Sequence, residues 1–169
     1  NVGPGTFIQI VGREVSLNVL GNELSGDFGF QQAADGPVLG QISNARLAFN
    51  NGSRDIVVLD SGNGALIATT AGLAFEFGGD LTVDLPDVSV TGSFTVAANT
   101  SNAAVNETID LTGTPQTRTL PAGPYLRITG SDVSLVIANQ SLSGNLIFER
   151  QNNGDILIAA REVNSSLAQ

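Results

Sequence analysis

The sequence has no cysteine, methionine, tryptophan, histidine or lysine, and it has a single tyrosine among its 169 residues. Without cysteine no disulfide can form and thiol catalysis is excluded. Without histidine the Ser-His-Asp triad is excluded, and the lack of both His and Cys removes the common zinc sites. The absence of lysine excludes Schiff-base chemistry and Lys–Asn isopeptide cross-links. We therefore expect that the chain is not an enzyme.

Positive charge is also scarce, because seven arginines face sixteen carboxylates and the net charge is −9. Such a field repels phosphates and anionic lipids, so we expect neither nucleic acid nor membrane insertion. The sequence shows no starting methionine, no signal peptide and no apolar run of membrane-spanning length, which favours a mature chain or an excised segment. Its aliphatic content argues against disorder.

An internal repeat is present. Residues 7–32 match residues 125–150 without a gap, at an offset of 118, and nine of the 26 positions are identical. The identities include 15–17 with 133–135 and 24–26 with 142–144. We therefore divide the chain into a first full repeat of about 118 residues, 1–122, and the start of a second, 123–169. We expect continuous β structure with no flexible linker between them.

Apolar and polar residues alternate over 14–20, 79–85 and 87–97, a period of two that is typical of strands with one dry face. Turn-forming residues separate such segments, and no window has helical spacing with caps. The pattern predicts strands joined by hairpins in an antiparallel meander. The predicted turns lie at 21–22, 35–36, 51–52, 62–64, 78–80, 85–87 and 153–155.

Three glycines, Gly26, Gly92 and Gly144, fall where the alternation calls for a core side chain. A glycine there indicates a bulge or a close approach of backbone, and its recurrence suggests a thin core with a fixed pinch point. We therefore predict an all-β fold in which a repetitive antiparallel β-meander forms an elongated β-solenoid-like rod. A β-sandwich is the alternative.

Carboxylates are the main remaining candidates for chemistry. Asp80, Asp84 and Asp87 form the densest cluster, and a solvated strand face with turn formers explains it. Calcium is the one cofactor considered, because two loops carry oxygen ligands. One segment contains Asp60 and Asn63, and the other contains Asn152 and Asp155. Each segment is also typical of a hairpin turn. Neither an EF-hand loop nor the glycine-rich calcium nonapeptide is present.

The tyrosine and the sequons are further candidates for binding or modification. Tyr125 aligns with Phe7 in the repeat, so we expect it in the core and not on a sugar-binding platform. Asn-x-Ser/Thr sequons are candidate glycosylation sites. They begin at Asn51, Asn99, Asn106, Asn139 and Asn164.

The phrases SVTGSFTVAANTSNAAVNETIDLTGTP (89–115) and LPAGPYLRITGSDVSLVIANQSLSGNLIFE (120–149) resemble the tandem repeats of giant repetitive bacterial surface proteins. The resemblance covers most of the chain. It implies a repetitive architecture and an extracellular or cell-surface location, and it carries over no site residues.

These observations favour a structural repeat segment of an acidic surface or filament-forming protein, a stalk, fibre or matrix. The expected partners are further repeats of the same protein or copies of the chain through self-association. An adhesin module that binds a polysaccharide or another cell surface is the alternative. An outer-membrane β-barrel is a remote one, because the aromatic girdles of such barrels are missing.

Overall fold

The computed structural model describes residues 6–19, 22–34 and 36–167, and these residues form eleven β-strands and no helix. The prediction of an all-β fold is confirmed. The strands are β1 (Thr6–Val19), β2 (Asn22–Ala33), β3 (Val38–Asn50), β4 (Asp55–Thr69), β5 (Gly72–Leu85), β6 (Val88–Asn99), β7 (Val105–Ile109), β8 (Gln116–Leu120), β9 (Tyr125–Ile137), β10 (Gln140–Arg150) and β11 (Ile156–Ser166).

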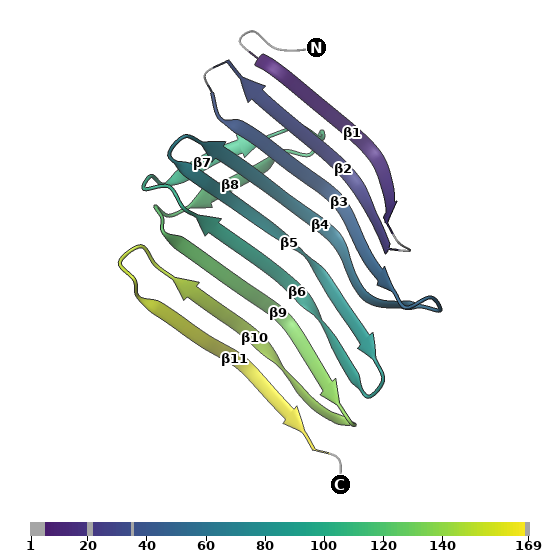
Figure 1. The fold of residues 1–169 in the computed structure, drawn as a ribbon. Helices are drawn as coiled ribbons and strands as arrows, with labels where there is room; N and C mark the ends of the chain where they lie inside the picture. The colour runs from purple at the N-terminus through teal and green to yellow at the C-terminus, as the bar shows by residue number, and fades with distance from the viewer. Residues whose placement is uncertain (1–5, 20–21, 35, 168–169) are drawn as a thin grey trace.

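Nine of the strands form one open antiparallel sheet in the order β1-β2-β3-β4-β5-β6-β9-β10-β11 (Figure 1). Each strand pairs with its neighbour in the chain except where β7 and β8 leave the sheet as a separate hairpin. The predicted meander is therefore confirmed. Successive strands of the sheet lie side by side and do not form stacked coils. β1 and β11 lie at opposite edges, so the sheet is not closed into a barrel.

The two copies of the sequence repeat form the same hairpin within this sheet. Val15 faces Gly26 across β1 and β2, and Val133 faces Gly144 across β9 and β10 at positions 118 residues later. The register shifts after Gly12 in the first copy and at Gly130 in the second. The prediction that 7–32 and 125–150 share a conformation is confirmed for their strands and the pairing between them, and the turn at 20–21 lies outside the described residues.

The structural repeat extends beyond the matched sequence and includes β3 and β11. Asp27 faces Ser43 in the first repeat, and the residues 118 positions later, Asn145 and Arg161, face each other in the second. β11 begins at the position of β3 shifted by the same offset, and it ends two positions earlier than the shifted β3. Three consecutive strands of the second repeat thus copy the first three.

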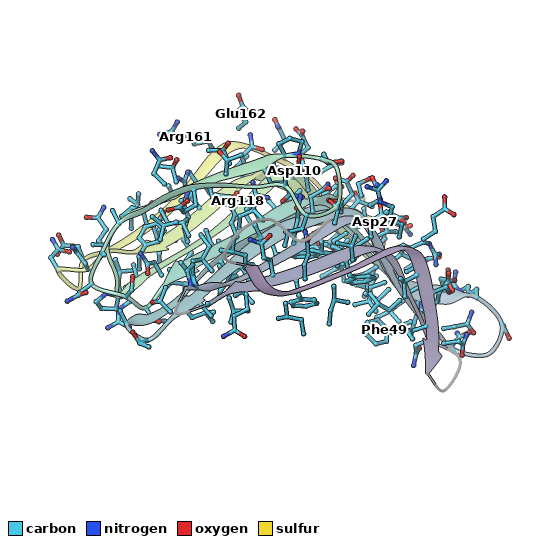
Figure 2. The ribbon with its side chains drawn as sticks, turned by 90° about the horizontal axis from the view of Figure 1, so that it is seen from above. Asp27, Phe49, Asp110, Arg118, Arg161 and Glu162 are labelled. Atoms are coloured by element: carbon cyan, nitrogen blue, oxygen red, sulfur yellow. The ribbon has the colours of Figure 1, made fainter. Side chains whose placement is uncertain are left out.

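The hairpin β7–β8 lies flat on one face of the sheet and makes the core there (Figures 1 and 2). Ile109 and Leu111 pack on Ala65 and Ile67 of β4. Leu120 packs beside Tyr125 with Ala74 and Ala97, so the prediction of Tyr125 as a core residue is confirmed. Small alanines in the sheet leave room for the larger hairpin side chains. Within the described residues this hairpin is the only second layer, so a sandwich of two large sheets is not formed.

Gln41 attaches the hairpin to the sheet through three hydrogen bonds. Its Oε1 accepts from the backbone N–H of Leu111 at 2.5 Å and of Thr112 at 3.3 Å, and its Nε2 donates to the carbonyl of Thr114 at 2.5 Å. Gln116 of the hairpin donates in return to the carbonyl of Ile42 at 3.0 Å. Gln41 is 3% exposed, so these bonds satisfy backbone groups that water does not reach.

Two of the predicted turns are wrong. Residues 62–64 lie inside β4 and residues 78–80 lie inside β5, where Asn63 faces Gly78. The glycines there accommodate a register shift between the two strands and do not reverse the chain. The turns at 51–52, 85–87 and 153–155 are present between strands. Gly21 and Asp35, which belong to two other predicted turns, lie outside the described residues.

Candidate functional site

A row of β-bulges crosses the sheet and repeats with the sequence. Five residues inside the strands have φ between 51° and 55°: Glu14, Asn44, Ser61, Asp132 and Glu162. Four of them occur at the register shifts of β1, β3, β4 and β9, and Glu162 occurs at the shift between β10 and β11. A non-glycine residue rarely adopts this conformation, and bulges are places where it is used. We call these five positions the bulge row.

The three recurring glycines lie against the bulge row. Their φ values, from 146° to 159°, disfavour any other residue. A Cβ added at Gly26 would lie 2.9 Å from Cα of Ala45, and one at Gly92 would lie 3.0 Å from Cα of Val133. The close approach predicted from the sequence is therefore present. It arises between neighbouring strands within the sheet, and not between two layers of a core.

A carboxylate next to the first glycine holds two bulges in place. Asp27 accepts the backbone N–H of Glu14 at 2.8 Å and the side-chain amide of Asn44 at 3.0 Å. Asp27 therefore joins the bulge of β1 to that of β3 through one side chain of β2. The hydrogen bond from Glu14, with that from Asn44 second, holds the pKa of Asp27 below its ordinary value.

The second repeat contains the equivalent arrangement with its chemical groups exchanged. Asn145 accepts the backbone N–H of Asp132 at 2.8 Å and donates from Nδ2 to Oε2 of Glu162 at 2.6 Å. Each arrangement lines a polar hollow on the hairpin side of the sheet, and Figure 2 shows Asp27 and Glu162 on that side. Five residues that line the first hollow have their counterparts, 118 positions later, in the lining of the second.

The opposite face of the sheet is apolar across all nine strands. We call it the apolar face, and Phe49 projects from it in Figure 2. One row of Cα partners crosses it without a polar side chain, from Gly12 in β1 through Phe28, Ile42, Gly64, Phe77, Val96, Ile128 and Phe148 to Ile158 in β11. Cross-strand partners point to the same side of a sheet, so these side chains form one surface.

No second layer covers the apolar face within the described residues. Phe30 is 49% exposed there, and Ile158 is 74% exposed. A hollow of about 320 Å³ lies between the rings of Phe28, Phe30, Phe75 and Phe77. Exposed apolar surfaces that extend over many strands mark places where other molecules bind.

The first predicted calcium loop lies in a different environment from the one expected. Asp60 and Asn63 are within β4 beside the bulge at Ser61, and not in a turn. Asp60 pairs with Arg46 at 3.4 Å, and Asn63 donates to the carbonyl of Ser61 at 2.6 Å. The amide of Asn63 thus presents its nitrogen to the backbone, and the carboxylate of Asp60 faces a cation.

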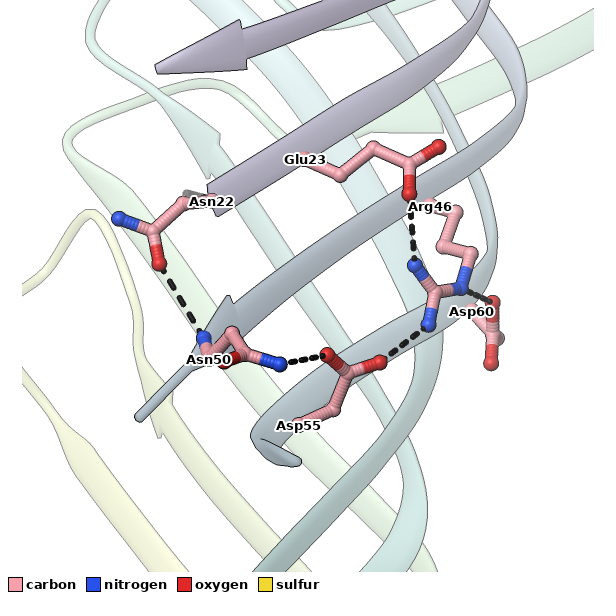
Figure 3. A network of polar contacts seen from close by, with 6 residues as sticks. All are labelled: Asn22, Glu23, Arg46, Asn50, Asp55 and Asp60. Atoms are coloured by element: carbon pink, nitrogen blue, oxygen red, sulfur yellow. Dashed lines mark hydrogen bonds and ion pairs between the residues drawn. The ribbon is translucent and has the colours of Figure 1, made fainter. Parts of the chain in front are cut away.

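Arg46 is the centre of a polar network that ties β2, β3 and β4 together (Figure 3). Its guanidinium contacts Asp55 at 2.7 Å, and Glu23 and Asp60 at 3.4 Å each. Asn50 donates to the other oxygen of Asp55 at 3.2 Å. The hydrogen bonds from Asn50 and Arg46 lower the pKa of Asp55, and the bond to Asp55 raises the pKa of Arg46. Because these groups are half-exposed, each pair contributes little stability.

The second calcium candidate forms the turn between β10 and β11, as the sequence suggests. Asp155 accepts from the amide of Asn153 at 2.7 Å, and its N–H donates to Oδ1 of Asn153 at 3.0 Å. Asn152 is exposed in the same turn. Among the described residues no three acidic side chains come together as a group that could hold a metal ion. The calcium sites therefore stay predictions.

The carboxylates of the densest acidic cluster have separate partners. Ser93 donates to Asp80 at 2.5 Å, and Arg54 pairs with Asp84 at 2.5 Å. Asp87 lies in the turn between β5 and β6 with φ of 59°. Two of the three are thus engaged in local structure, which agrees with a solvated strand face.

The sequons differ in accessibility. Asn99 is 0% exposed and its Nδ2 donates to the carbonyls of Ala103 at 2.8 Å and Pro121 at 2.7 Å. Both amide hydrogens are used, so this nitrogen cannot receive a glycan in the folded chain. The acceptor residues of the other four sequons are exposed: Asn51, Asn106, Asn139 and Asn164.

No protein-family model, curated protein or solved structure matches the chain. The resemblance to giant bacterial surface repeats therefore stays a prediction. None of the described residues belongs to a helix long and apolar enough to cross a membrane.

Proposed function

We propose that the chain is a non-catalytic structural repeat segment of an extracellular surface or filament-forming protein. In this proposal successive repeats lengthen one sheet into a stalk, fibre or matrix element. The observation that carries it is that β9, β10 and β11 take the registers and bulges of β1, β2 and β3 within the same sheet. Each repeat joins the sheet of the preceding repeat. Further repeats can therefore be added through the same kind of contact.

Composition supports the same proposal. The absence of Cys and Met leaves no sulfur for oxidants to attack, which suits a long-lived protein outside the cell. The net charge of −9 keeps separate rods apart in solution. With no disulfide, strength along such a rod would come from the ladder of backbone hydrogen bonds between strands.

Electron microscopy of the native assembly tests the proposal through its axial period. One repeat contributes six strands, β1–β6, to the sheet before β9 starts the next. Neighbouring strands lie about 4.8 Å apart, so each repeat should advance the sheet by about 29 Å. We expect filaments whose diffraction contains both spacings. A native particle that is compact, without either spacing, would rule the proposal out.

A surface-binding module is the second candidate, and the recurring polar hollow favours it. The hollow beside Asp27 and the hollow beside Asn145 both present hydroxyl, amide and carboxylate groups, with the amide and the carboxylate exchanged between them, and a site that recurs in this way suits a repetitive polysaccharide. Titration calorimetry with acidic and neutral polysaccharides tests this. A binding heat that Asp27→Ala and Asn145→Ala abolish would support it, and no heat with any polysaccharide would reject it.

A further inference from the structure

The outer side of β1, the side away from β2, has a counterpart inside the molecule. β1 and β9 share their bulge, with φ of 51° at Glu14 and 52° at Asp132, and each pairs on one side with a glycine-containing strand, β2 or β10. β9 has a second neighbour, β6, on its other side. Within the described residues β1 has β2 alone. The paired side of β9 therefore gives the geometry of the corresponding side of β1.

The junction between β6 and β9 depends on one glycine. Gly92 lies where the register shifts between Thr91 and Ser93, beside the bulge of β9. Its φ is 153°, and an added Cβ would lie 3.0 Å from Cα of Val133 and 3.2 Å from the carbonyl oxygen of Ser131. A bulge normally blocks an edge against further pairing. Here a glycine in the neighbouring strand removes that obstacle.

Every strand that pairs with a β1-type strand carries a glycine at this point. Gly26 has this role in β2, Gly92 in β6 and Gly144 in β10. The other edge strand of the sheet, β11, has Glu162 at its own bulge and no glycine between Ile156 and Ser166. A second copy that presented β11 would therefore not reproduce the junction.

We propose that the outer edge of β1 is a docking site for a β6-type strand from another repeat of this protein. The strand pairs antiparallel with β1 and places its glycine against the bulge at Glu14. Subtracting 118 from the β9 positions gives the register: the counterpart of Val90 faces Leu17, that of Phe94 faces Gly12 and that of Val96 faces Ile10. In this register the apolar face continues from one repeat to the next. This inference rests on the proposed function, since it names the partner that lengthens the sheet.

Disulfide cross-linking tests the register, because the chain contains no cysteine of its own. The probe is a peptide with the sequence of residues 86–101, flanked by lysines for solubility and carrying Val90→Cys. It is mixed with the full chain carrying Leu17→Cys, whose native side chain is 53% exposed. We expect the cross-link to form at least tenfold faster than with the chain carrying Ser16→Cys, whose side chain points to the other face. Equal rates, or no cross-link at all, would overturn the inference.

Two controls separate edge docking from other events. A peptide that also carries Gly92→Val should lose the preference for Leu17→Cys, and its retention would overturn the role given to the glycine. The chain with Leu135→Cys reports displacement of β6 itself, since Leu135 faces Val90 in the intact sheet. We expect no cross-link there, and a rate equal to that of Leu17→Cys would count against docking at the edge. If the peptide does not cross-link, the inference about the edge is wrong, while the axial period of the native assembly still tests the proposed function independently.

Discussion

Asn44 donates a hydrogen bond to the carboxylate of Asp27 at 3.0 Å and so joins the bulge of β3 to β2. In the second repeat the amide is on β10 and the carboxylate on β11, where Asn145 donates to Glu162 at 2.6 Å. In both repeats one partner is an amide and the other a carboxylate, although no position keeps its residue. The repeat therefore preserves a donor–acceptor pair and not a sequence.

The exchanged pair predicts that the effect of one substitution depends on the other. Asn145→Asp alone places two carboxylates in contact, so we expect a lower midpoint of urea unfolding at pH 7. Adding Glu162→Gln restores an amide–carboxylate pair and should recover most of the loss. The acceptor for the N–H of Asp132 is kept in both variants. If the double variant is no more stable than Asn145→Asp, the pair has no such role.

The acid limb of the stability curve should depend on Asp27. Its pKa is lower in the folded chain than the ordinary value of 3.8, so at low pH the folded chain binds fewer protons than the unfolded chain. The contribution is present above that value and is lost as the pH falls below it. We expect Asp27→Asn to reduce the slope of unfolding free energy against pH in this range. Asp87→Asn, in the turn between β5 and β6, is the control, and an identical slope in wild type and Asp27→Asn would contradict the assignment.

The glycines beside the bulge row should tolerate no side chain. Gly144→Val requires a φ of 159° from a β-branched residue and places Cβ 3.0 Å from the carbonyl oxygen of Arg161. We expect a loss of about 1–3 kcal/mol in unfolding free energy. Leu146→Val in the same strand and on the same face, 46% exposed, is the control and should cost less. Equal losses in a urea titration would show that the conformation of Gly144 is not constrained.

The hairpin should detach when Gln41 is shortened. Gln41→Ala leaves the buried N–H groups of Leu111 and Thr112 without their acceptor, which costs about 1–3 kcal/mol. We expect faster amide hydrogen exchange at these two residues, while the strands of the sheet keep their protection. Gln140→Ala, at the exposed start of β10, is the control. Unchanged exchange at Leu111 would mean that the hairpin stays attached without the hydrogen bonds of Gln41.

The alternation of residues predicts the strands and the meander because one face of every strand is apolar. The glycines at 62–64 and 78–80 predict turns that are not formed, since a glycine inside a bulge and one inside a turn have the same local signature. The sequences of β3 and β11 share little identity, so a comparison of the sequences does not reveal that the two strands are equivalent. The Arg-Glu-Val triplets at 13–15 in β1 and 161–163 in β11 each contain a bulge residue, so they signal a bulge and not the correspondence of β11 with β3.

The hairpin and its binding to the sheet were beyond prediction from local patterns. Gln41 and Leu111 are 70 residues apart, and nothing near either residue specifies the other. The same holds for the bulge row, because a positive φ at Glu14 or Asp132 follows from neighbouring strands and not from the residue itself. Composition excluded several chemistries, but it could not indicate that the apolar face lacks a second layer within the described residues.

Each repeat adds an even number of strands to the sheet, the six strands β1–β6, and β7 and β8 leave it together as a hairpin, which keeps the number even. An antiparallel chain that passes an even number of strands returns to its starting direction, so β9 runs the same way as β1 (Figure 1). Every further repeat would then present the same face and the same turns on the same side. A ribbon built in this way has two chemically different ends, and each of its units can join only head to tail.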